Sequence, residues 1–149
     1  SRWDFLYVAW GIYARPALTL LEGTLLLNWY LRAMGSRIGR NVVLGGGFAQ
    51  VVDPDMLNFE EGSTVTCHFQ AHTFEDRVLK IDHVWIRPGA TVAGNAVMLY
   101  GADVGANTYV APHSVVMKRE VLLPRRSYAG CPVTIQRHQE SIKPESQSI

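Results

Sequence analysis

The sequence predicts an all-β protein, a parallel β-helix, with a helical segment in front of it. The first observation is a six-residue repeat whose aliphatic positions share one register: Ile86, Val92, Met98, Val104, Val110 and Val116. The second is a small residue four positions after each of the first five: Ala90, Ala96, Ala102, Thr108 and Ser114. Such a hexapeptide repeat is typical of a coil in which each repeat forms one short strand and one corner.

The corners of this coil give the third observation. The residues just before the small positions are Gly89, Asn95, Gly101, Asn107 and His113. Gly and Asn enter the left-handed backbone region at the lowest energetic cost, so they suit a corner every sixth residue. Since three repeats close one triangular turn, we expect stacking in three pairs: Ile86 on Val104, Val92 on Val110, and Met98 on Val116.

The chain divides into a helical lead-in at residues 1–36, the coil at 37–132 and a polar tail at 133–149. The lead-in is rich in Leu, Trp and Tyr, and we expect two helices interrupted near Pro16 and Gly23, because Pro breaks a helix and Gly weakens it. None of its apolar runs reaches the roughly 18 residues of a membrane-spanning helix. It is therefore expected to cap or flank the coil, and contact with a membrane surface is the alternative.

The six-residue phase is interrupted within the coil. Phe59 starts a repeat that lies 27 residues before Ile86, which is not a multiple of six. We therefore predict an insertion and place it at residues 71–83, which are rich in charged side chains. The pattern is expected to stop after Glu120, with residues 127–132 forming a tight turn that closes the coil.

The charge and the cysteine content of the chain argue against several classes of function. The formal net charge is +1 and no basic stripe with interleaved aromatics occurs, so we do not expect nucleic-acid binding. Cys67 and Cys131 fit no CxxC pattern, which argues against both a disulfide framework and a structural zinc site. No signal peptide is visible, so we expect a cytoplasmic location, at the inner face of a membrane if the lead-in touches lipid.

The chemistry is expected in residues 68–77, HFQAHTFEDR. A histidine in a loop that leaves the coil is accessible to solvent, and His is a common general base near neutral pH. Glu75 or Asp76 could bind the second ring nitrogen of such a base. The alternative is that His68 and His72 are two surface histidines beside a charged loop. A zinc site needs three converging protein ligands, and no third ligand has a supporting context here, so we predict no metal.

Several segments resemble the hexapeptide acyltransferases, whose coil is a left-handed parallel β-helix. The matching segments are QAHTFEDR at 70–77, VWI at 84–86, SVVMK at 114–118 and GCP at 130–132. By this resemblance the coil is left-handed, and His72 stands at the position of the catalytic histidine. Arg87, His113 and Cys131 depart from the family pattern along the expected CoA track, where the family has Gly, Gly and Asn.

The resemblance implies direct acyl transfer without a covalent enzyme intermediate. His72 would deprotonate the acceptor, and Glu75 would orient His72. The same resemblance implies further substrate contacts by Gln70, Asp76, Arg77, His113, Ser114, Gly130 and Cys131. It also implies a homotrimer in which His72 lies near a subunit boundary.

A more specific resemblance includes the lead-in. The segments WYLRAMGSRIGR at 29–40, HTFEDRVLK at 72–80 and SVVMKRE at 114–120 resemble the C-terminal acyltransferase-like modules of the non-ribosomal-peptide-synthetase-like enzymes of the ε-poly-L-lysine synthetase type. This implies transfer of a carrier-bound aminoacyl thioester to an amine, which forms an amide or isopeptide bond. The donor would be the phosphopantetheine thioester of a carrier domain, or CoA, with no tightly bound cofactor. The alternatives are a stand-alone acetyl-CoA-dependent acetyltransferase and a non-catalytic trimerising scaffold.

Overall fold

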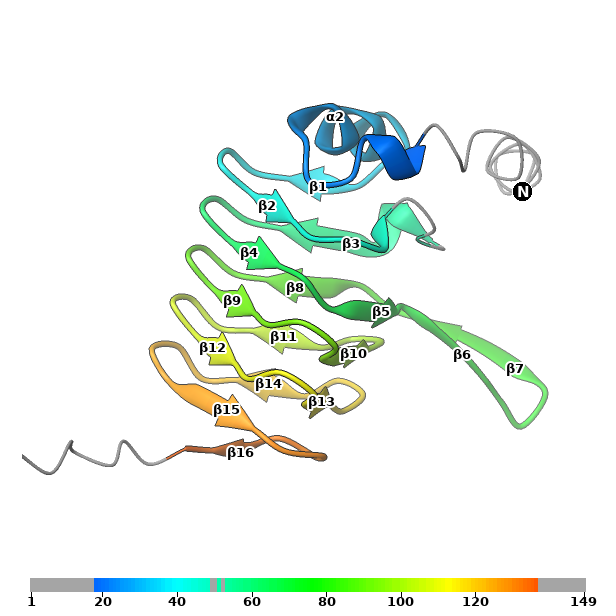
Figure 1. The fold of residues 1–149 in the computed structure, drawn as a ribbon. Coiled ribbons are helices and arrows are strands. Elements are labelled where there is room, and N and C mark those ends of the chain that lie inside the picture. The colour runs from blue at the N-terminus through cyan, green and yellow to red at the C-terminus, as the bar shows by residue number, and fades with distance from the viewer. Residues whose placement is uncertain (1–17, 49–50, 52, 137–149) are drawn as a thin grey trace, which may run out of the picture.

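The computed structural model describes residues 18–48, 51 and 53–136, and it shows a parallel β-helix with one sheet on each of three sides (Figure 1). Sheet A contains β1 (Arg37–Ile38), β3 (Leu57–Phe59), β8 (Val84–Ile86), β11 (Asp103–Val104) and β14 (Val121–Leu122). Sheet B contains β2 (Val43–Leu44), β4 (Thr64–Val65), β9 (Thr91–Val92), β12 (Tyr109–Val110), β15 (Ser127–Ala129) and β16 (Thr134–Ile135). Sheet C contains β5 (His68–Gln70), β10 (Val97–Leu99) and β13 (Val115–Val116).

The predicted stacking of the coil core is confirmed. Val104 pairs with Ile86, Val110 with Val92, and Val116 with Met98 in parallel ladders. All six of these side chains are fully buried inside the coil. A strand exposes alternate residues on opposite faces, so each short strand sends one apolar side chain inward and its neighbours outward.

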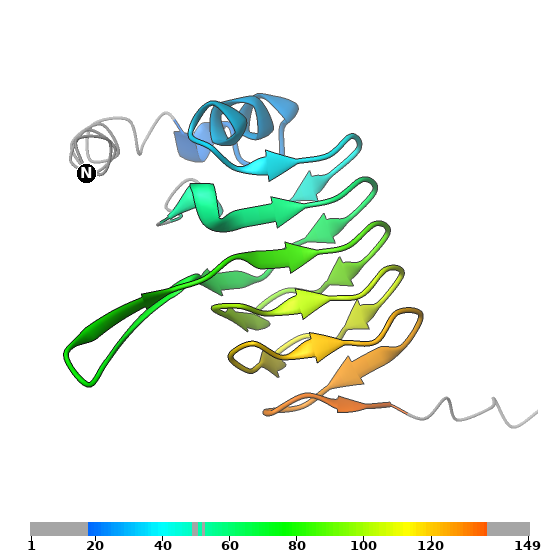
Figure 2. The same cartoon turned by 180° about the vertical axis from the view of Figure 1, so that it is seen from behind.

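The predicted corners are also confirmed. Gly89, Asn95, Gly101, Asn107 and His113 all have positive φ angles, between 53° and 75°. The corners of successive coils stack in columns along the helix, which Figure 2 shows from behind. The small side chain that follows each corner is buried: Ala90, Ala96, Ala102, Thr108 and Ser114.

The six-residue pattern continues beyond Glu120, so the prediction that it stops there is wrong. Leu122 stacks on Val104 and Tyr128 on Val110, which extends the same register by two more repeats. The corners before these strands are occupied by Arg119 and Arg125 in the left-handed region, with φ angles of 55° and 57°. Arg is not a residue that marks such a corner in a sequence, and the pattern was therefore lost there.

The C-terminal end of the coil is closed by β16. This strand pairs antiparallel with β15 after a cis peptide bond between Cys131 and Pro132. Val133 is buried beneath it. The first residues of the predicted tail are therefore part of the folded unit.

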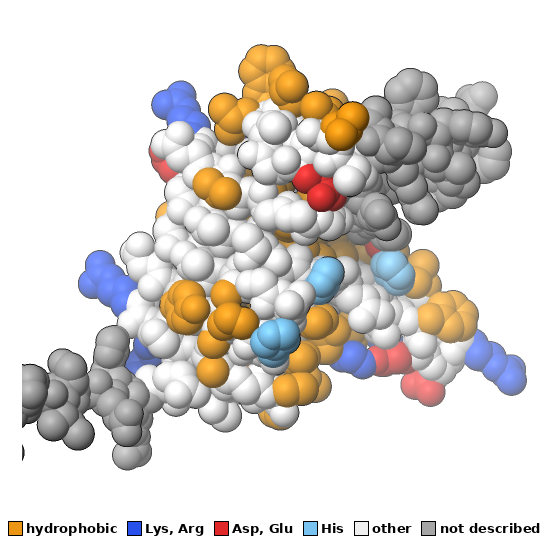
Figure 3. All heavy atoms as spheres, in the orientation of Figure 1, with side chains coloured by type: hydrophobic (Ala, Val, Ile, Leu, Met, Phe, Trp, Pro, Cys, Tyr) orange, Lys and Arg blue, Asp and Glu red, His pale blue; other side chains and the backbone are white. Residues whose placement is uncertain are grey.

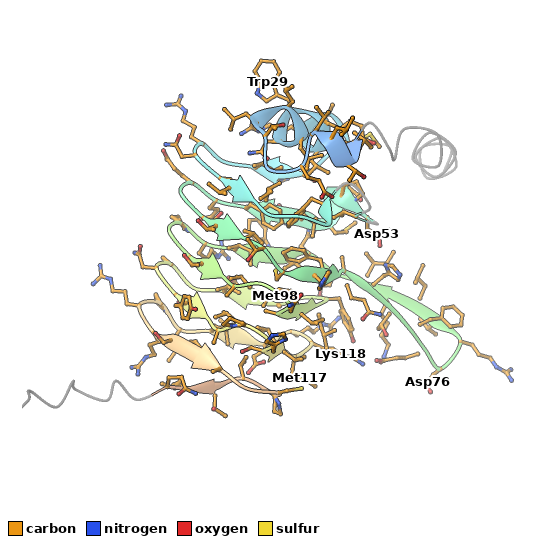
Figure 4. The ribbon with its side chains drawn as sticks, viewed as in Figure 1. Trp29, Asp53, Asp76, Met98, Met117 and Lys118 are labelled. Carbon is orange, nitrogen blue, oxygen red and sulfur yellow. The ribbon has the colours of Figure 1, made fainter. Side chains whose placement is uncertain are left out.

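The N-terminal end of the coil is covered by α2 (Leu25–Ala33), which buries Leu27 and Leu31 against the core. The opposite face of α2 exposes Leu25, Leu26 and Trp29, and Figure 4 shows Trp29 pointing away from the coil. Part of the predicted lead-in, residues 1–17, lies outside the described residues. No helix in the described ranges has the length and apolarity needed to cross a bilayer. Contact of the lead-in with a membrane surface stays a prediction.

The predicted insertion is confirmed as a β-hairpin that leaves the coil after β5. It consists of β6 (His72–Glu75) and β7 (Val78–Ile81), paired antiparallel with His72 opposite Ile81. Asp76 and Arg77 form its two-residue turn with φ angles of 51° and 63°, as a type I′ hairpin turn requires. The hairpin projects well clear of the coil (Figures 1 and 2).

Candidate active site

His72 is held at the base of the hairpin by a carboxylate from the N-terminal side of the coil. Its Nδ1 atom lies 2.5 Å from Oδ2 of Asp53. Asp53 immediately precedes the short 3₁₀ helix η2 (Pro54–Met56) and has a left-handed φ of 58°, a region that Asp enters more readily than most residues other than Gly. The side chains of His72 and Asp53 are 37% and 26% exposed, so the pair is accessible from outside.

This geometry defines the chemistry open to His72. An ionised carboxylate only accepts hydrogen bonds, so Nδ1 of His72 is the donor and carries the hydrogen. The second ring nitrogen, Nε2, then keeps its lone pair and can accept a proton from a substrate. A carboxylate–imidazole pair of this kind is the arrangement that supports general-base catalysis.

Glu75 does not have the predicted role in this arrangement, which is a correction to the sequence analysis. Its carboxylate pairs with Lys80, at 3.0 Å, and with Lys118. Residues three apart in a strand point to opposite faces, so Glu75 lies on the other face of the ribbon from His72. Asp53 was missed because no periodic pattern links it to His72, 19 residues further along the chain.

A pocket of about 320 Å³ opens beside His72. Among the described residues it is lined by Gly47, Phe48, Val51, Cys67, His68, Phe69 and His72. It exists because β5 is the first strand of sheet C, whereas sheets A and B begin one turn earlier with β1 and β2. The interior side chain of Phe69 therefore lacks a covering strand, and Phe48 packs against it with ring centroids 5.6 Å apart.

The pocket has an apolar floor and a polar mouth. Phe48 and Cys67 are buried, and burial raises the pKa of the Cys67 thiol far above its usual range, so this thiol stays neutral. His68 and His72 lie at the exposed mouth, and histidines gather on this face of the molecule in Figure 3. The pocket offers His72 as a base beside an apolar surface, and it offers no thiolate nucleophile.

Two carboxylates lie close to the described lining of the pocket. Asp53 contacts His72, and the Glu22 carboxylate accepts a hydrogen bond of 2.9 Å from the backbone N–H of Gly47. No Lys or Arg is among the described residues that line the pocket. The carboxylate of Asp53 beside His72 therefore suits a positively charged or neutral group better than a phosphate.

The hairpin-tip residues of the predicted substrate set lie away from His72. Asp76 and Arg77 form the exposed tip, at the far end of the ribbon from the coil, as the labelled Asp76 shows in Figure 4. Gln70 ends β5 and is exposed on the outer face of sheet C. Of these three, Gln70 is nearest in sequence to the pocket, and none lines it.

The remaining predicted contacts lie two and three turns further along the coil. Ser114 is fully buried, and its Oγ accepts a hydrogen bond of 3.2 Å from the N–H of Gly130. This bond joins two turns of the coil to each other. It corrects the prediction of substrate contacts by Ser114 and Gly130. His113 and Cys131 are exposed near the same edge, outside the pocket beside His72.

Arg87 departs from the family pattern for a reason that the structure shows. Its guanidinium makes a two-pronged contact with Asp103, at 2.8 and 2.7 Å, and a third contact with Glu60 at 3.0 Å. It also lies 4.6 Å from the ring centre of Trp85. These carboxylates raise the pKa of Arg87, chiefly through the hydrogen bonds to Asp103. Arg87 thus joins three neighbouring turns of sheet A.

No group of three or more His, Cys, Asp or Glu side chains that could hold a metal ion occurs in the described part of the chain. His68 and His72 lie at one pocket and Asp53 contacts His72 there, but these three described residues do not form such a group.

Solved structures with this architecture were found by comparison. A hexapeptide-repeat-containing acetyltransferase from Vibrio cholerae superposes with a TM-score of 0.67 at 14% identity, over 92% of each chain. The same enzyme in complex with acetyl coenzyme A gives 0.62 at 16% identity, over 83% of this chain and 84% of that one. The fold is that of the hexapeptide-repeat acetyltransferases. The left-handed β-helix is thereby confirmed.

A third structure and one sequence relative extend this comparison. A maltose O-acetyltransferase from Clostridium difficile 630 has a TM-score of 0.61 at 14% identity, over 89% of this chain and 87% of that one. A delta-poly-L-ornithine synthetase from Acinetobacter baumannii (strain AB307-0294) is 30% identical over 117 residues, which is 77% of this chain. The chain spans 9% of the length of that relative. No family profile matches the sequence. The predicted similarity to a poly-amino-acid synthetase is confirmed.

Proposed function

We propose that this domain forms an amide bond by transferring an acyl group from a thioester to an amine, with His72 as the general base. The observation that carries the proposal is the 2.5 Å contact between His72 and Asp53 at the mouth of an apolar pocket. Asp53 takes the positioning role that the sequence analysis gave to Glu75.

The reaction is a direct transfer. The amine nitrogen attacks the thioester carbonyl carbon and its proton passes to Nε2 of His72, so that a C–N bond forms. The C–S bond then breaks, and the leaving sulfur takes the proton back from the imidazolium. Asp53 keeps the ring oriented through Nδ1 and stabilises its positive charge. Proton transfer of this kind contributes about 10²–10⁴-fold to a rate.

The proposed donor is an aminoacyl thioester on the phosphopantetheine arm of a carrier domain. The similarity to part of a long poly-amino-acid synthetase supports a partner within the same enzyme. Free CoA carries phosphates that need cations. In the described part of the chain, the cations near the hairpin base, Lys80, Lys118 and Arg119, are each paired with a carboxylate. The pocket itself holds none.

The proposed acceptor is an amine with an aliphatic body. A protonated amine is attracted by Asp53 and releases one proton to solvent before its nitrogen can attack, and methylene groups suit the floor formed by Phe48 and Phe69. The relative's product, a poly-ornithine by its name, contains an amine of this kind.

The direct test is a side-by-side assay of a loaded carrier domain and acetyl-CoA as donors, each with amino-acid acceptors. We expect faster turnover with the loaded carrier. Faster turnover with acetyl-CoA would contradict the carrier part of the proposal. It would favour the second candidate, an acetyl-CoA-dependent acetyltransferase, which the acetyl-CoA complex of the Vibrio cholerae structure supports.

We also infer that the domain forms a homotrimer with His72 near the subunit boundary. Phe74, Leu79 and Ile81 lie on the same face of the ribbon as His72 and are 71%, 53% and 43% exposed. A two-stranded hairpin is only marginally stable alone, so this apolar face is expected to pack on a second copy. Light scattering across the micromolar range should report a trimer, and Phe74→Ser should weaken it. A strict monomer at all concentrations would remove the shared site and leave the non-catalytic trimerising scaffold without support.

A further inference from the structure

The hairpin that carries His72 is attached to the coil by a second contact, far from Asp53. Its strands pair only with each other and form a sheet of their own. On its polar face, Glu75 contacts Lys118, which follows β13 two turns further along the coil. Just after β7, Asp82 accepts a contact of 3.3 Å from Nε of Arg119. Two consecutive cations of one corner therefore hold both strands of the ribbon.

The contact between the hairpin and the coil is a network of charged side chains that lies against the buried ring of Tyr100. The Lys118 ammonium and the Arg119 guanidinium each lie 5.8 Å from the ring centre of Tyr100, which is buried in the coil. Glu75 is shared between Lys118 and Lys80 of the hairpin itself. Isolated exposed ion pairs contribute little to stability, but several charges in one network with an aromatic support contribute more. Figure 3 shows acidic and basic side chains meeting between the coil and the hairpin.

The network and Asp53 act on opposite sides of the hairpin base. Figure 4 shows Asp53 on the N-terminal side and Lys118 on the C-terminal side. The ribbon joins the coil at Ala71 and Asp82, where the N–H of Asp82 donates a hydrogen bond of 3.1 Å to the carbonyl of Ala71. His72 is the next residue after this joint. Any change in the angle of the ribbon at the joint therefore moves the His72 ring relative to Asp53.

We propose that Lys118 is a positioning residue for His72: by holding Glu75, it sets the angle of the hairpin and with it the place of Nε2 beside the pocket. The inference rests on the proposed function in one respect, that His72 acts as the base. Glu75 thus serves the site through Lys118 on the polar face of the ribbon. A misplacement of about 1 Å at a reacting group can cost about 10²-fold in rate, so a small tilt suffices.

The test compares three substitutions in the whole domain. Lys118→Met removes the cation of the coil and should lower kcat about tenfold with KM changed less than twofold, since the tilt misplaces a base and leaves the pocket intact. Lys118→Arg keeps the charge and should restore kcat. Lys80→Met is the matched control, because Lys80 binds the same carboxylate but joins the hairpin only to itself. It should leave kcat within twofold.

Two readouts do not depend on turnover. Amide hydrogen exchange over residues 78–81 should accelerate in Lys118→Met while β10 stays protected, because the loss of the tether loosens only the ribbon. The proton resonance of the hydrogen bond from His72 Nδ1 to Asp53 should weaken in Lys118→Met and persist in Lys80→Met. If the wild-type domain shows no acyl transfer with any donor, the proposed function fails, and these two signals still decide on the tether. Unchanged exchange and an unchanged His72 resonance in Lys118→Met would overturn the positioning role, as would unchanged kcat in an active domain.

Discussion

The turns from β8 to β13 and the region around β5 are both built on the six-residue repeat. Only the region around β5 is interrupted by segments that leave the coil. From β8 to β13 each turn has a strand on all three sides, and each inward side chain stacks on that of the next turn. Around β5 the chain departs from the coil twice, in the segment that carries Phe48 and Asp53 and in the hairpin of β6 and β7. The regular turns build a closed apolar core, and the irregular turns open it at one place.

This difference explains where the candidate site lies. In the regular turns the interior is filled by stacked apolar side chains, and polar groups such as Arg87 and Asp103 meet on the outer face. Sheet C has no strand in the turn of β1 and β2, so Phe69 of β5 is left partly open. Two segments that leave the coil there bring Asp53 and His72 within 2.5 Å of each other. The regular turns therefore supply stability, and the interruption supplies chemistry. Each prediction below tests that division.

The largest effect is expected in the interrupted region and on activity alone. His72→Ala should lower kcat by roughly 10²–10⁴-fold, because it removes the base, and the melting temperature should stay the same. His68→Ala is the matched control. It removes a histidine from the same pocket mouth whose ring no carboxylate contacts in the described part of the chain, so its effect should be far smaller. Equal losses in steady-state assays of both variants would contradict the assignment of the base.

The next effect concerns the partner of the base. Asp53→Asn should lower kcat roughly 10²-fold, less than the about 10⁴-fold of a buried Ser-His-Asp triad, because both partners are partly exposed here. Asp55→Asn changes an exposed carboxylate two residues away and should leave kcat unaltered. Steady-state assays with a saturating donor measure both. If Glu75→Gln lowers kcat more than Asp53→Asn does, Glu75 is the orienting residue after all.

Within the regular turns the effect should fall on stability. A Cβ atom at Gly105 would lie 2.5 Å from the carbonyl oxygen of Leu122, which belongs to the backbone of the next turn and cannot move freely. Gly105→Ala should therefore lower the free energy of unfolding by about 1–3 kcal/mol. Gly94→Ala, where a Cβ would meet nothing within 4 Å, should change it by less than about 0.5 kcal/mol. Urea unfolding of both variants measures the difference, and equal values would contradict the close stacking of turns.

The smallest effect is a gain. Arg125 occupies a corner with a φ of 57°, which costs an ordinary L-residue about 1–2 kcal/mol and costs Asn less. Arg125→Asn should therefore stabilise the coil by up to about 1 kcal/mol, seen as a higher melting temperature. Arg126→Asn changes its neighbour, whose φ is not positive, and serves as the control. A melting temperature that falls in Arg125→Asn would show that the arginine side chain contributes more than its backbone costs.

The regular part of the fold could be predicted almost completely from the sequence. Six aliphatic residues in one register gave the stacking pairs, and the Gly and Asn residues between them marked the left-handed corners. The insertion at 71–83 was visible as a loss of phase, and His72 was visible as a histidine within it. These features are local or periodic, so residues close together in the sequence are enough to predict them.

Only the tertiary structure decided the partners. Asp53 rather than Glu75 contacts His72, Lys118 reaches Glu75 across two turns, and the coil continues through Arg119 and Arg125 to β15. Which groups meet at the interruption depends on how the stacked turns place segments that carry no repeat of their own. The six-residue period determines the regular turns from which these segments leave. The directions in which the two segments leave determine which side chains meet between them.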